Sequence, residues 1–220
     1  MGLFFVILIL GKEKNMSTNT LEMKSKALPT QVLAATAVLS AISYILAFLE
    51  VPVPLSPSFA RMDLSDFPAL IGAFAFGPVA GILIELIKNV LQLFSSSTGG
   101  VGEIANFLMG ASYVIVAGMI YRKHKTKKRA AVSCVLASIA MGIVAAITNY
   151  FILLPLFETF MPLNQVIAAF GEFLPFIHTK LDVVLYNAFP FNVLKGLVIG
   201  ALAMVSYKHL SPILKKNRVR

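Results

Sequence analysis

Long apolar segments dominate this sequence, and they constrain its fold more than any other feature. Hydrophobic residues make up 58% of the 220 positions and charged residues only 13%, about half the share that is usual in soluble domains. A chain with so few charges cannot cover its surface with polar groups, so a lipid bilayer is the solvent that suits it. At about 20 residues for each crossing, the length allows roughly six spans. The sequence therefore predicts an all-α, polytopic membrane protein with six transmembrane helices in a compact bundle.

Prolines, glycines and polar clusters set the boundaries of these spans. The proline-rich stretch 51–57 ends the first span, Gly77 and Pro78 separate the second from the third, and the polar turn 95–100 precedes the fourth. Asp66 is the expected N-cap of the short second span. The connection before the sixth span has about 35 residues, and its segment 164–174 is predicted to form a short interfacial helix. The predicted spans are approximately 31–49, 66–76, 79–94, 103–121, 130–154 and 190–209.

Basic residues in the connections predict the orientation. With six spans, one side of the membrane carries fifteen lysines and arginines: four in the N-terminal tail, six in the loop 122–129 and five from Lys208 onward. The other side carries only Arg61 and Lys180. Because cytoplasmic connections collect such residues, we expect both termini in the cytoplasm of a multi-pass cell-membrane protein. Clustering of this kind also argues against nucleic acid as a partner.

The ends of the chain are expected to be tails. We divide the sequence into an N-terminal tail at 1–27, poorly ordered or interfacial, a membrane domain at 28–210 and a basic tail at 211–220. The apolar start at 1–10 is too short to span a membrane, and it lacks the basic residues and cleavage site of a signal peptide. Met1 and Met16 both remain open as the true start.

A polar stripe inside the third predicted span marks the first part of a candidate site. Glu85, Lys88, Asn89 and Gln92 follow the spacing i, i+3, i+4 and i+7, which places them on one face of a helix. Ionisable groups are costly within the membrane and by default mark a functional site. The alternative is a Glu85–Lys88 pair that only holds helices together.

Three further polar residues are expected at the same level. At 1.5 Å per residue, Asn192 and Lys195 lie roughly 3–8 Å below the outer edge of the hydrocarbon core, and Asn149 reaches a comparable depth. Lys88 lies roughly 14 Å from the inner edge on the same count. Polar groups from three helices therefore gather in the outer half, which favours a cavity open to the exterior over scattered interhelical hydrogen bonds.

The connection 51–65 would lie above this cavity. It mixes bulky apolar side chains with charged ones, as expected of a lid, although a simple connector is the alternative. The residues that give it this character are Phe59, Arg61, Met62, Asp63 and Leu64.

A face of small residues on the first span is a candidate docking surface for a partner. Ala34, Ala37 and Ala41 lie along one side, and Ala37 and Ala41 form a small-x-x-x-small pattern that allows helices to approach closely. Packing within the same bundle is the alternative, since alanine is common in apolar spans.

Catalytic and metal-binding patterns are missing from the sequence. It contains no His-Glu-x-x-His helix, no Gly-x-Ser-x-Gly turn and no phosphate-binding glycine loop. The three histidines are far apart, and Cys134 is the only cysteine, so no metal site is expected. We therefore expect no enzyme and no bound ATP, and any pumping would need a partner.

Two short sequence motifs resemble those of a known family. They are RMDLSDFP at 61–68, before the short second span, and FPFNVLKG at 189–196, at the start of the sixth. With the six predicted spans and the alanine pattern, the region from Leu28 to Leu210 resembles the substrate-binding S components of energy-coupling factor (ECF) vitamin transporters. The two motifs are similar to the riboflavin-specific branch.

This resemblance implies capture of riboflavin from outside the cell. Transport would need a transmembrane coupling protein and two cytoplasmic ATPases, with release by toppling of the whole S component. Loop 59–64 would cover the pocket, and Ala37 and Ala41 would face the coupling protein. The implied polar contacts are Glu85, Lys88, Asn149, Asn192 and Lys195, and we add Asn89, which lies on the same polar stripe as Glu85 and Lys88.

The residue chemistry suits such a ligand. Riboflavin is neutral and rich in hydrogen-bonding groups, which lysine, asparagine and glutamate can satisfy. Phe59, Met62 and Tyr150 are the expected apolar walls. Lys195 has no obvious counter-ion in the sequence, which leaves flavin mononucleotide (FMN) open as a ligand. A stand-alone secondary transporter, or an S component for another vitamin, remains the alternative.

Overall fold

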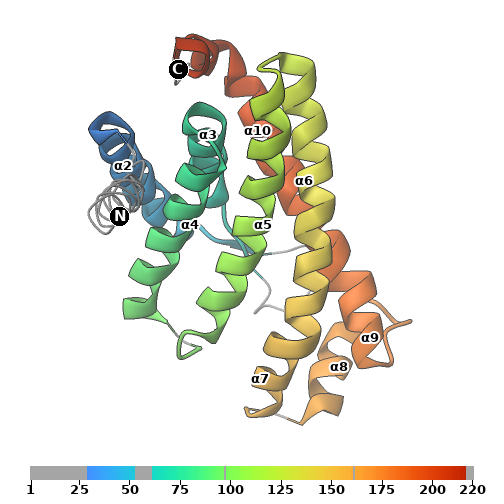
Figure 1. Cartoon of the computed structure of the whole chain (residues 1–220). Coiled ribbons are helices and arrows are strands. Elements are labelled where there is room, and N and C mark those ends of the chain that lie inside the picture. Colours follow the sequence, from blue (N-terminus) through green and yellow to red (C-terminus); the bar gives the residue numbers. More distant parts are fainter. Residues whose placement is uncertain (1–28, 53–60, 97, 161, 217–220) are drawn as a thin grey trace, which may run out of the picture. The chain divides into compact units, whose positions relative to one another are not determined.

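The computed structural model describes residues 29–52, 61–96, 98–160 and 162–216 (Figure 1). For Pro52, Arg61 and residues 208–216 it describes the backbone alone. By its internal contacts the chain divides into Met1–Thr30 and Gln31–Arg220, and almost all of the first unit, including the tail predicted at 1–27, lies outside the described residues.

Helices account for most of the described residues of the unit Gln31–Arg220, which confirms the all-α prediction. Five helices form the main part of the structure, α3 and several short helices join them, and a pair of two-residue strands precedes α3. The long helices and α3 are α2 (Thr30–Ala47), α3 (Asp66–Phe76), α4 (Pro78–Gln92), α5 (Val101–Lys123), α6 (Lys127–Thr148) and α10 (Phe189–Lys216). The shorter elements are β1 (Val51–Pro52), β2 (Arg61–Met62), η1 (Leu93–Ser95), η2 (Asn149–Leu153), α7 (Leu154–Glu158), α8 (Leu163–Gly171), α9 (Lys180–Val183) and η3 (Val184–Ala188).

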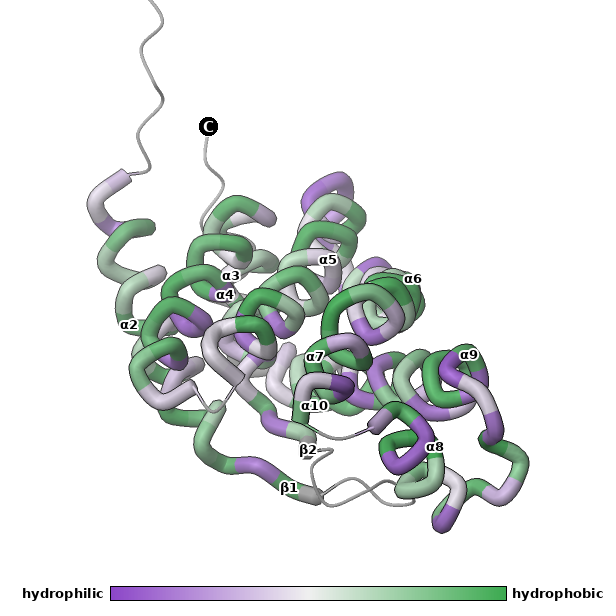
Figure 2. Tube along the Cα trace, turned by 90° about the horizontal axis from the view of Figure 1, so that it is seen from below, coloured by the Kyte–Doolittle hydropathy of each residue, from purple (hydrophilic) through white to green (hydrophobic). Residues whose placement is uncertain are grey.

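Five helical stretches of the described chain are long and apolar enough to cross a membrane. The predicted count of six is not met by length, because α3 has 11 residues and is therefore only about 16 Å long. Seen from below, the long helices are coloured mainly as hydrophobic (Figure 2). Val38, Ile45 and Val205 are all more than half exposed, as expected of side chains that face lipid. The chain is thus a membrane protein in which α3 is enclosed by longer helices.

The break between α3 and α4 follows the sequence prediction. Gly77 has a φ of +102°, a conformation that a residue with a side chain rarely adopts, and Pro78 occupies the first turn of α4. The start of α3 differs from the prediction. Ser65 is the N-cap and makes no side-chain capping bond, and Asp66 is the first residue of the helix and not its N-cap. Its carboxylate is instead directed to two lysines, as described below.

Two π-helical segments extend the fifth and sixth predicted spans beyond their expected limits. The stretches Lys127–Glu158 and Lys180–Tyr207 are continuous, whereas the sequence predicted an end near Leu154 and a start at Pro190. Pro155 and Pro190 each stand two residues after a π segment. The wider π turn allows the helix to continue across a proline, which lacks the N–H of the normal α-helical bond. The two π segments also carry residues that line the cavity described below.

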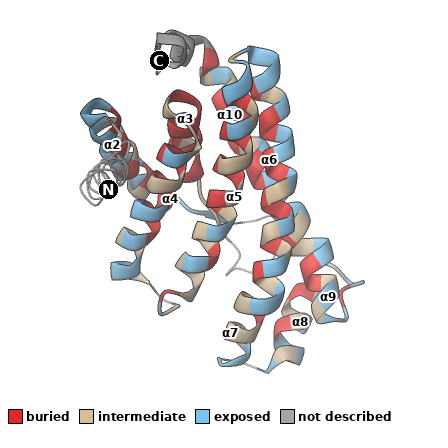
Figure 3. Ribbon diagram, viewed as in Figure 1, coloured by how far each residue is buried: buried red, intermediate tan, exposed pale blue. Residues whose placement is uncertain are grey.

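Close approach of α10 to α6 depends on glycine. A Cβ atom on Gly200 would lie 2.7 Å from the Cβ of Cys134, and one on Gly196 would lie 2.9 Å from the Cβ of Ser138. The Tyr113 hydroxyl donates a hydrogen bond to the Gly196 carbonyl oxygen over 2.8 Å, which ties α5 to the same contact. Figure 3 shows buried positions along α3, α5, α6 and α10, and α5 and α10 each contact both α3 and α6. This region, together with the part of α4 against it, is called the packed half below.

A second, smaller core lies at the other end of the helices. It is formed by α7, α8 and α9 with their connections, and its buried residues are Leu154, Val166, Phe170, Ile177, Val183 and Val184. The helix α8 (Leu163–Gly171) confirms the short helix predicted at 164–174. Thr179 and Asp182 form a capping box that starts α9. Together with the polar cavity beside it, this region is called the cavity half.

Candidate ligand-binding site

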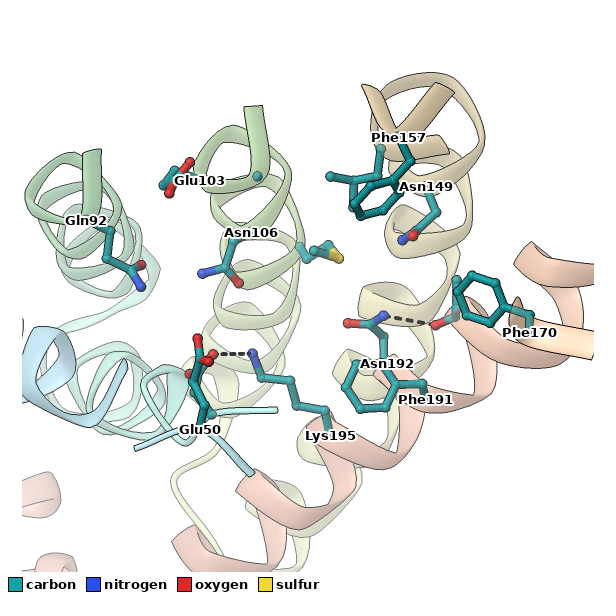
Figure 4. A pocket seen from close by; sticks show the side chains of 15 residues that line it. Glu50, Gln92, Glu103, Asn106, Asn149, Phe157, Phe170, Phe191, Asn192 and Lys195 are labelled. Atoms are coloured by element: carbon teal, nitrogen blue, oxygen red, sulfur yellow. Dashed lines mark hydrogen bonds and ion pairs between the residues drawn. The ribbon is translucent and has the colours of Figure 1, made fainter. Parts of the chain in front are cut away.

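A polar cavity of about 280 Å³ lies among α4, α5, α8, α10 and the π segments (Figure 4). That volume is near the lower end of the range typical of small-molecule sites. The cavity is lined by charged, amide and aromatic side chains: Glu50, Asp63, Gln92, Gly102, Glu103, Asn106, Met109, Asn149, Leu153, Phe157, Phe170, Ala188, Phe191, Asn192 and Lys195. Polar groups distributed around apolar walls are typical of sites that orient a ligand by hydrogen bonds.

The three outer residues singled out in the sequence meet at this cavity. Asn149 is on η2, whereas Asn192 and Lys195 are one turn apart on α10. The Asn149 amide nitrogen donates to the Ala145 carbonyl oxygen over 2.8 Å, and that of Asn192 donates to Ala188 over 2.9 Å. These bonds fix both side chains against their own helices and leave each Oδ1 to accept a hydrogen bond from a ligand.

Lys195 has two carboxylate partners, which corrects the view of it as a lysine without a counter-ion. Its Nζ lies 2.9 Å from Asp66 Oδ2 and 3.4 Å from Asp63 Oδ2. Both Lys195 and Asp66 are buried, and Asp63 is half-buried at the cavity wall. The sequence argument for a phosphate at Lys195 therefore loses its basis.

The stripe on α4 lies largely behind the cavity. Lys88 Nζ lies 2.7 Å from both Asp66 Oδ1 and Glu85 Oε2, and it donates to Ser65 Oγ over 2.9 Å. Lys88, Glu85 and Asp66 are fully buried, and neither Glu85 nor Lys88 lines the cavity. Their pairing joins α3 to α4, as the sequence alternative of a pair that holds helices together expects, with Asp66 as an additional partner.

The amides of the stripe continue toward the cavity. Asn89 does not line it, but its Oδ1 accepts a hydrogen bond of 3.1 Å from the Asn106 amide, which does. Gln92 lines the cavity directly, and no described residue donates a hydrogen bond to its buried Oε1. Gln92 therefore offers an acceptor to a ligand, and Asn89 helps to hold Asn106 in place.

The predicted lid residues have different positions. Phe59 lies outside the described residues, and Arg61 is described only by its backbone, which pairs with Pro52 between β2 and β1. Asp63 reaches the cavity, and its Oδ1 accepts a hydrogen bond of 2.7 Å from the Ser65 backbone N–H. Met62 and Leu64 are half-buried and do not line the cavity.

The apolar walls also differ from the sequence expectation. Tyr150 does not line the cavity, and the Lys180 ammonium lies 4.8 Å from the centre of its ring. Phe157, Phe170 and Phe191 supply the aromatic surface instead. The one-residue shift from Asn149 to Tyr150 explains the error, because neighbouring residues on a helix do not share a face.

Several cavity residues were not predicted. Glu103 lies in the first turn of α5, and its Oε2 accepts hydrogen bonds from Ser96 Oγ and Thr98 Oγ1 over 2.9 and 3.0 Å. Asn106 follows one turn later, a spacing that could have revealed a second polar face. Asp66 does not line the cavity but pairs with Lys195, and the sequence indicated it only as a capping residue, because a carboxylate at a helix start has that ordinary explanation.

Comparison with known proteins decides the family. The sequence model of the substrate-specific component of ECF transporters matches residues 31–207. The chain belongs to this family. It is 37% identical over 179 residues to the riboflavin transporter RibU of Staphylococcus aureus, which covers 81% of this chain and 89% of that protein. It is 34% identical over 189 residues to the riboflavin transporter FmnP of Bacillus subtilis, which covers 84% of this chain and 95% of that protein.

A solved structure, described as the S component of a bacterial ECF transporter, has the same fold. The TM-score is 0.68 at 35% identity, over 84% of this chain and 98% of that one. The chain is thus a transport protein of the membrane and not an enzyme. Within the described part of this S component, no three histidine, cysteine or acidic side chains are grouped to hold a metal ion.

The alanine face of this S component is exposed. Ala34, Ala37 and Ala41 lie on the side of α2 opposite to its buried residues, which include Thr36, Ser40 and Ser43. The Ser43 hydroxyl donates to the Ser65 carbonyl oxygen, so α2 turns its polar side toward the α3 start. Packing inside the bundle, the alternative reading of the alanines, does not match their exposure among the described residues.

Proposed function

We propose that this chain is the riboflavin-binding S component of an ECF transporter in the cell membrane. The observation that carries the proposal is the convergence of Asn149, Asn192 and Lys195 on one cavity. Carbonyl oxygens of a flavin ring would accept from Lys195, and ribityl hydroxyls would pair with the two asparagines. Gln92 Oε1 offers an acceptor for the imide N–H. Names of the relatives support the same ligand.

The charges of the cavity wall favour riboflavin over FMN. Lys195 carries the one ammonium group among the described residues that line the cavity, and it is already paired with Asp63 and Asp66. A phosphate would find no unpaired cation among these residues and would meet the carboxylates of Asp63 and Glu103 in a partly buried setting. An uncharged ligand avoids that repulsion.

The cavity would open to the outside of the cell. The turn between α5 and α6, at the end away from the cavity half, is basic and largely exposed, as expected of a cytoplasmic connection. Asp63, which follows β2, lines the cavity, and the connection 51–65 would act as its lid. Glu85, Lys88 and Asn89 would support the site from behind.

Transport would require partners. We propose that Ala34, Ala37 and Ala41 form the surface that packs against a transmembrane coupling protein, which in turn works with two cytoplasmic ATPases. The exposure of this face supports the proposal, since small side chains allow a partner helix to approach closely.

The absorption spectrum of the purified protein tests the ligand. We expect a yellow preparation with flavin bands, released as riboflavin on denaturation. A colourless protein that also fails to quench added riboflavin fluorescence would refute the proposal. Uptake by the chain without a coupling protein or ATPases would favour the stand-alone transporter instead.

A further inference from the structure

Asp66 is the one described residue that contacts both buried lysines. Its Oδ1 lies 2.7 Å from Lys88 Nζ, and its Oδ2 lies 2.9 Å from Lys195 Nζ. We propose that Asp66 is a positioning and specificity-determining residue, which fixes the Lys195 ammonium at the cavity wall and biases the site toward an uncharged flavin. This inference rests on the proposed function, because it assigns a role within the same site.

The two carboxylates hold the Lys195 ammonium at the cavity wall. A lysine ammonium has three hydrogens on a flexible four-carbon stem, so it needs fixed partners to have a defined direction. Lys195 Nζ donates a hydrogen bond to Asp63 Oδ2 over 3.4 Å and forms an ion pair with Asp66 Oδ2 at 2.9 Å, and its side chain lines the cavity. Asp66 is the closer and the more buried of the two partners, with a side chain that is 0% exposed against 15% for Asp63. The hydrogens that these partners do not engage are available to a ligand acceptor.

The charge balance gives Asp66 its effect on specificity. Lys195 pairs with two carboxylates, those of Asp63 and Asp66, whereas Glu85 pairs with Lys88. Replacement of Asp66 by asparagine leaves Lys195 one carboxylate partner, Asp63, at 3.4 Å. Lys195 would then be less neutralised, and the cavity would accept a phosphorylated flavin more readily.

Glu85 provides a matched comparison within the same cluster. Its carboxylate is as deeply buried as that of Asp66 and lies at the same 2.7 Å from Lys88 Nζ. It has no described contact with Lys195 and does not line the cavity. It packs against Gly110, where a Cβ atom would collide with it. A change at Glu85 therefore disturbs the ion cluster without acting on Lys195 directly.

A double-mutant cycle tests the inference. The dissociation constants of riboflavin and FMN are measured by flavin fluorescence for wild type, Asp66→Asn, Lys195→Met, the double variant and Glu85→Gln. We expect Asp66→Asn to weaken riboflavin binding about tenfold or more, because a charged hydrogen bond loses its support. Its ratio of FMN to riboflavin Kd should fall by about threefold or more. Glu85→Gln should leave that ratio unchanged.

The cycle separates positioning from a purely structural role. If Asp66 acts through Lys195, the double variant should bind riboflavin as Lys195→Met does, to within about twofold. If Asp66→Asn alone does not fold, Lys195→Met and the double variant still provide this comparison. Losses of riboflavin affinity that multiply in the double variant would overturn the inference. So would a ratio of FMN to riboflavin Kd that is unchanged in Asp66→Asn, as it is expected to be in Glu85→Gln. Wild-type protein that binds no riboflavin would overturn the proposed function itself, and the inference with it.

Discussion

The packed half and the cavity half of the bundle use opposite kinds of residue. Around Gly196 and Gly200, helices α6 and α10 approach so closely that no side chain fits between them. In the cavity half, amides, carboxylates and aromatic rings surround an open volume of about 280 Å³. Lipid offers no hydrophobic drive between helices, so close packing of small residues has to hold the fold. The residues that stabilise the fold and those proposed to recognise the ligand therefore lie in separate regions, joined by the ion cluster of Asp66, Glu85, Lys88 and Lys195.

The largest expected effect lies in the packed half. Gly200→Leu would drive a side chain into Cys134 and should lower the free energy of unfolding by about 3 kcal/mol. Ala201→Leu is the matched control, because Ala201 is its neighbour on α10 and is exposed. Thermal unfolding in detergent, followed by circular dichroism, measures both. Equal melting temperatures for the two variants would contradict the role of close packing.

Lys195→Met should affect binding most strongly in the cavity half. The ligand loses a charged donor, which is worth about 2 kcal/mol or about 30-fold in Kd. Asp66 keeps Lys88 as its partner, so the thermal midpoint without ligand should fall less than in Gly200→Leu. Riboflavin titration and thermal unfolding of the same sample measure the two effects. A Lys195→Met protein with a low thermal midpoint and normal riboflavin affinity would contradict the assignment of Lys195 to ligand binding.

The two asparagines should have smaller effects. Asn192→Ala and Asn149→Ala each remove one neutral hydrogen-bonding side chain and should weaken riboflavin binding by about 1–2 kcal/mol. Isothermal titration calorimetry with riboflavin tests both variants. Wild-type affinity in both would mean that the ligand binds elsewhere.

The smallest effect on affinity is expected outside both halves, on α2. Ala37→Trp should leave riboflavin binding unchanged but abolish assembly with the coupling protein and cellular uptake, because the bulky ring blocks close helix contact. Ile42→Trp is the control, since Ile42 is also exposed but lies on another face of α2. Normal uptake with Ala37→Trp would contradict the docking role.

Local patterns in the sequence predicted most of the long helices and three polar residues that line the cavity. Apolar runs with their glycine and proline breaks predicted α2, α4 and α5, and helical depth brought Asn149, Asn192 and Lys195 together. The prediction that these three residues lie together was well founded because polar groups are costly within the membrane.

What the sequence did not reveal depends on tertiary contacts. A pair that forms between residues 66 and 195 leaves no local signal, and the carboxylate of Asp66 has an ordinary explanation as a helix cap. The π segments were missed because Pro155 and Pro190 normally end a helix. The inward direction of Glu85 and Lys88 was predicted, but only packing decides whether such residues reach a cavity or stop behind it.

Titration of riboflavin fluorescence with the purified protein tests the central claim most directly. Wild type and the triple variant Asn149→Ala, Asn192→Ala, Lys195→Met would be compared at equal folded concentration, verified by circular dichroism. We predict stoichiometric quenching at one riboflavin per wild-type chain and no quenching by the folded triple variant. Equal quenching by both proteins would contradict the assignment of this cavity as the riboflavin site.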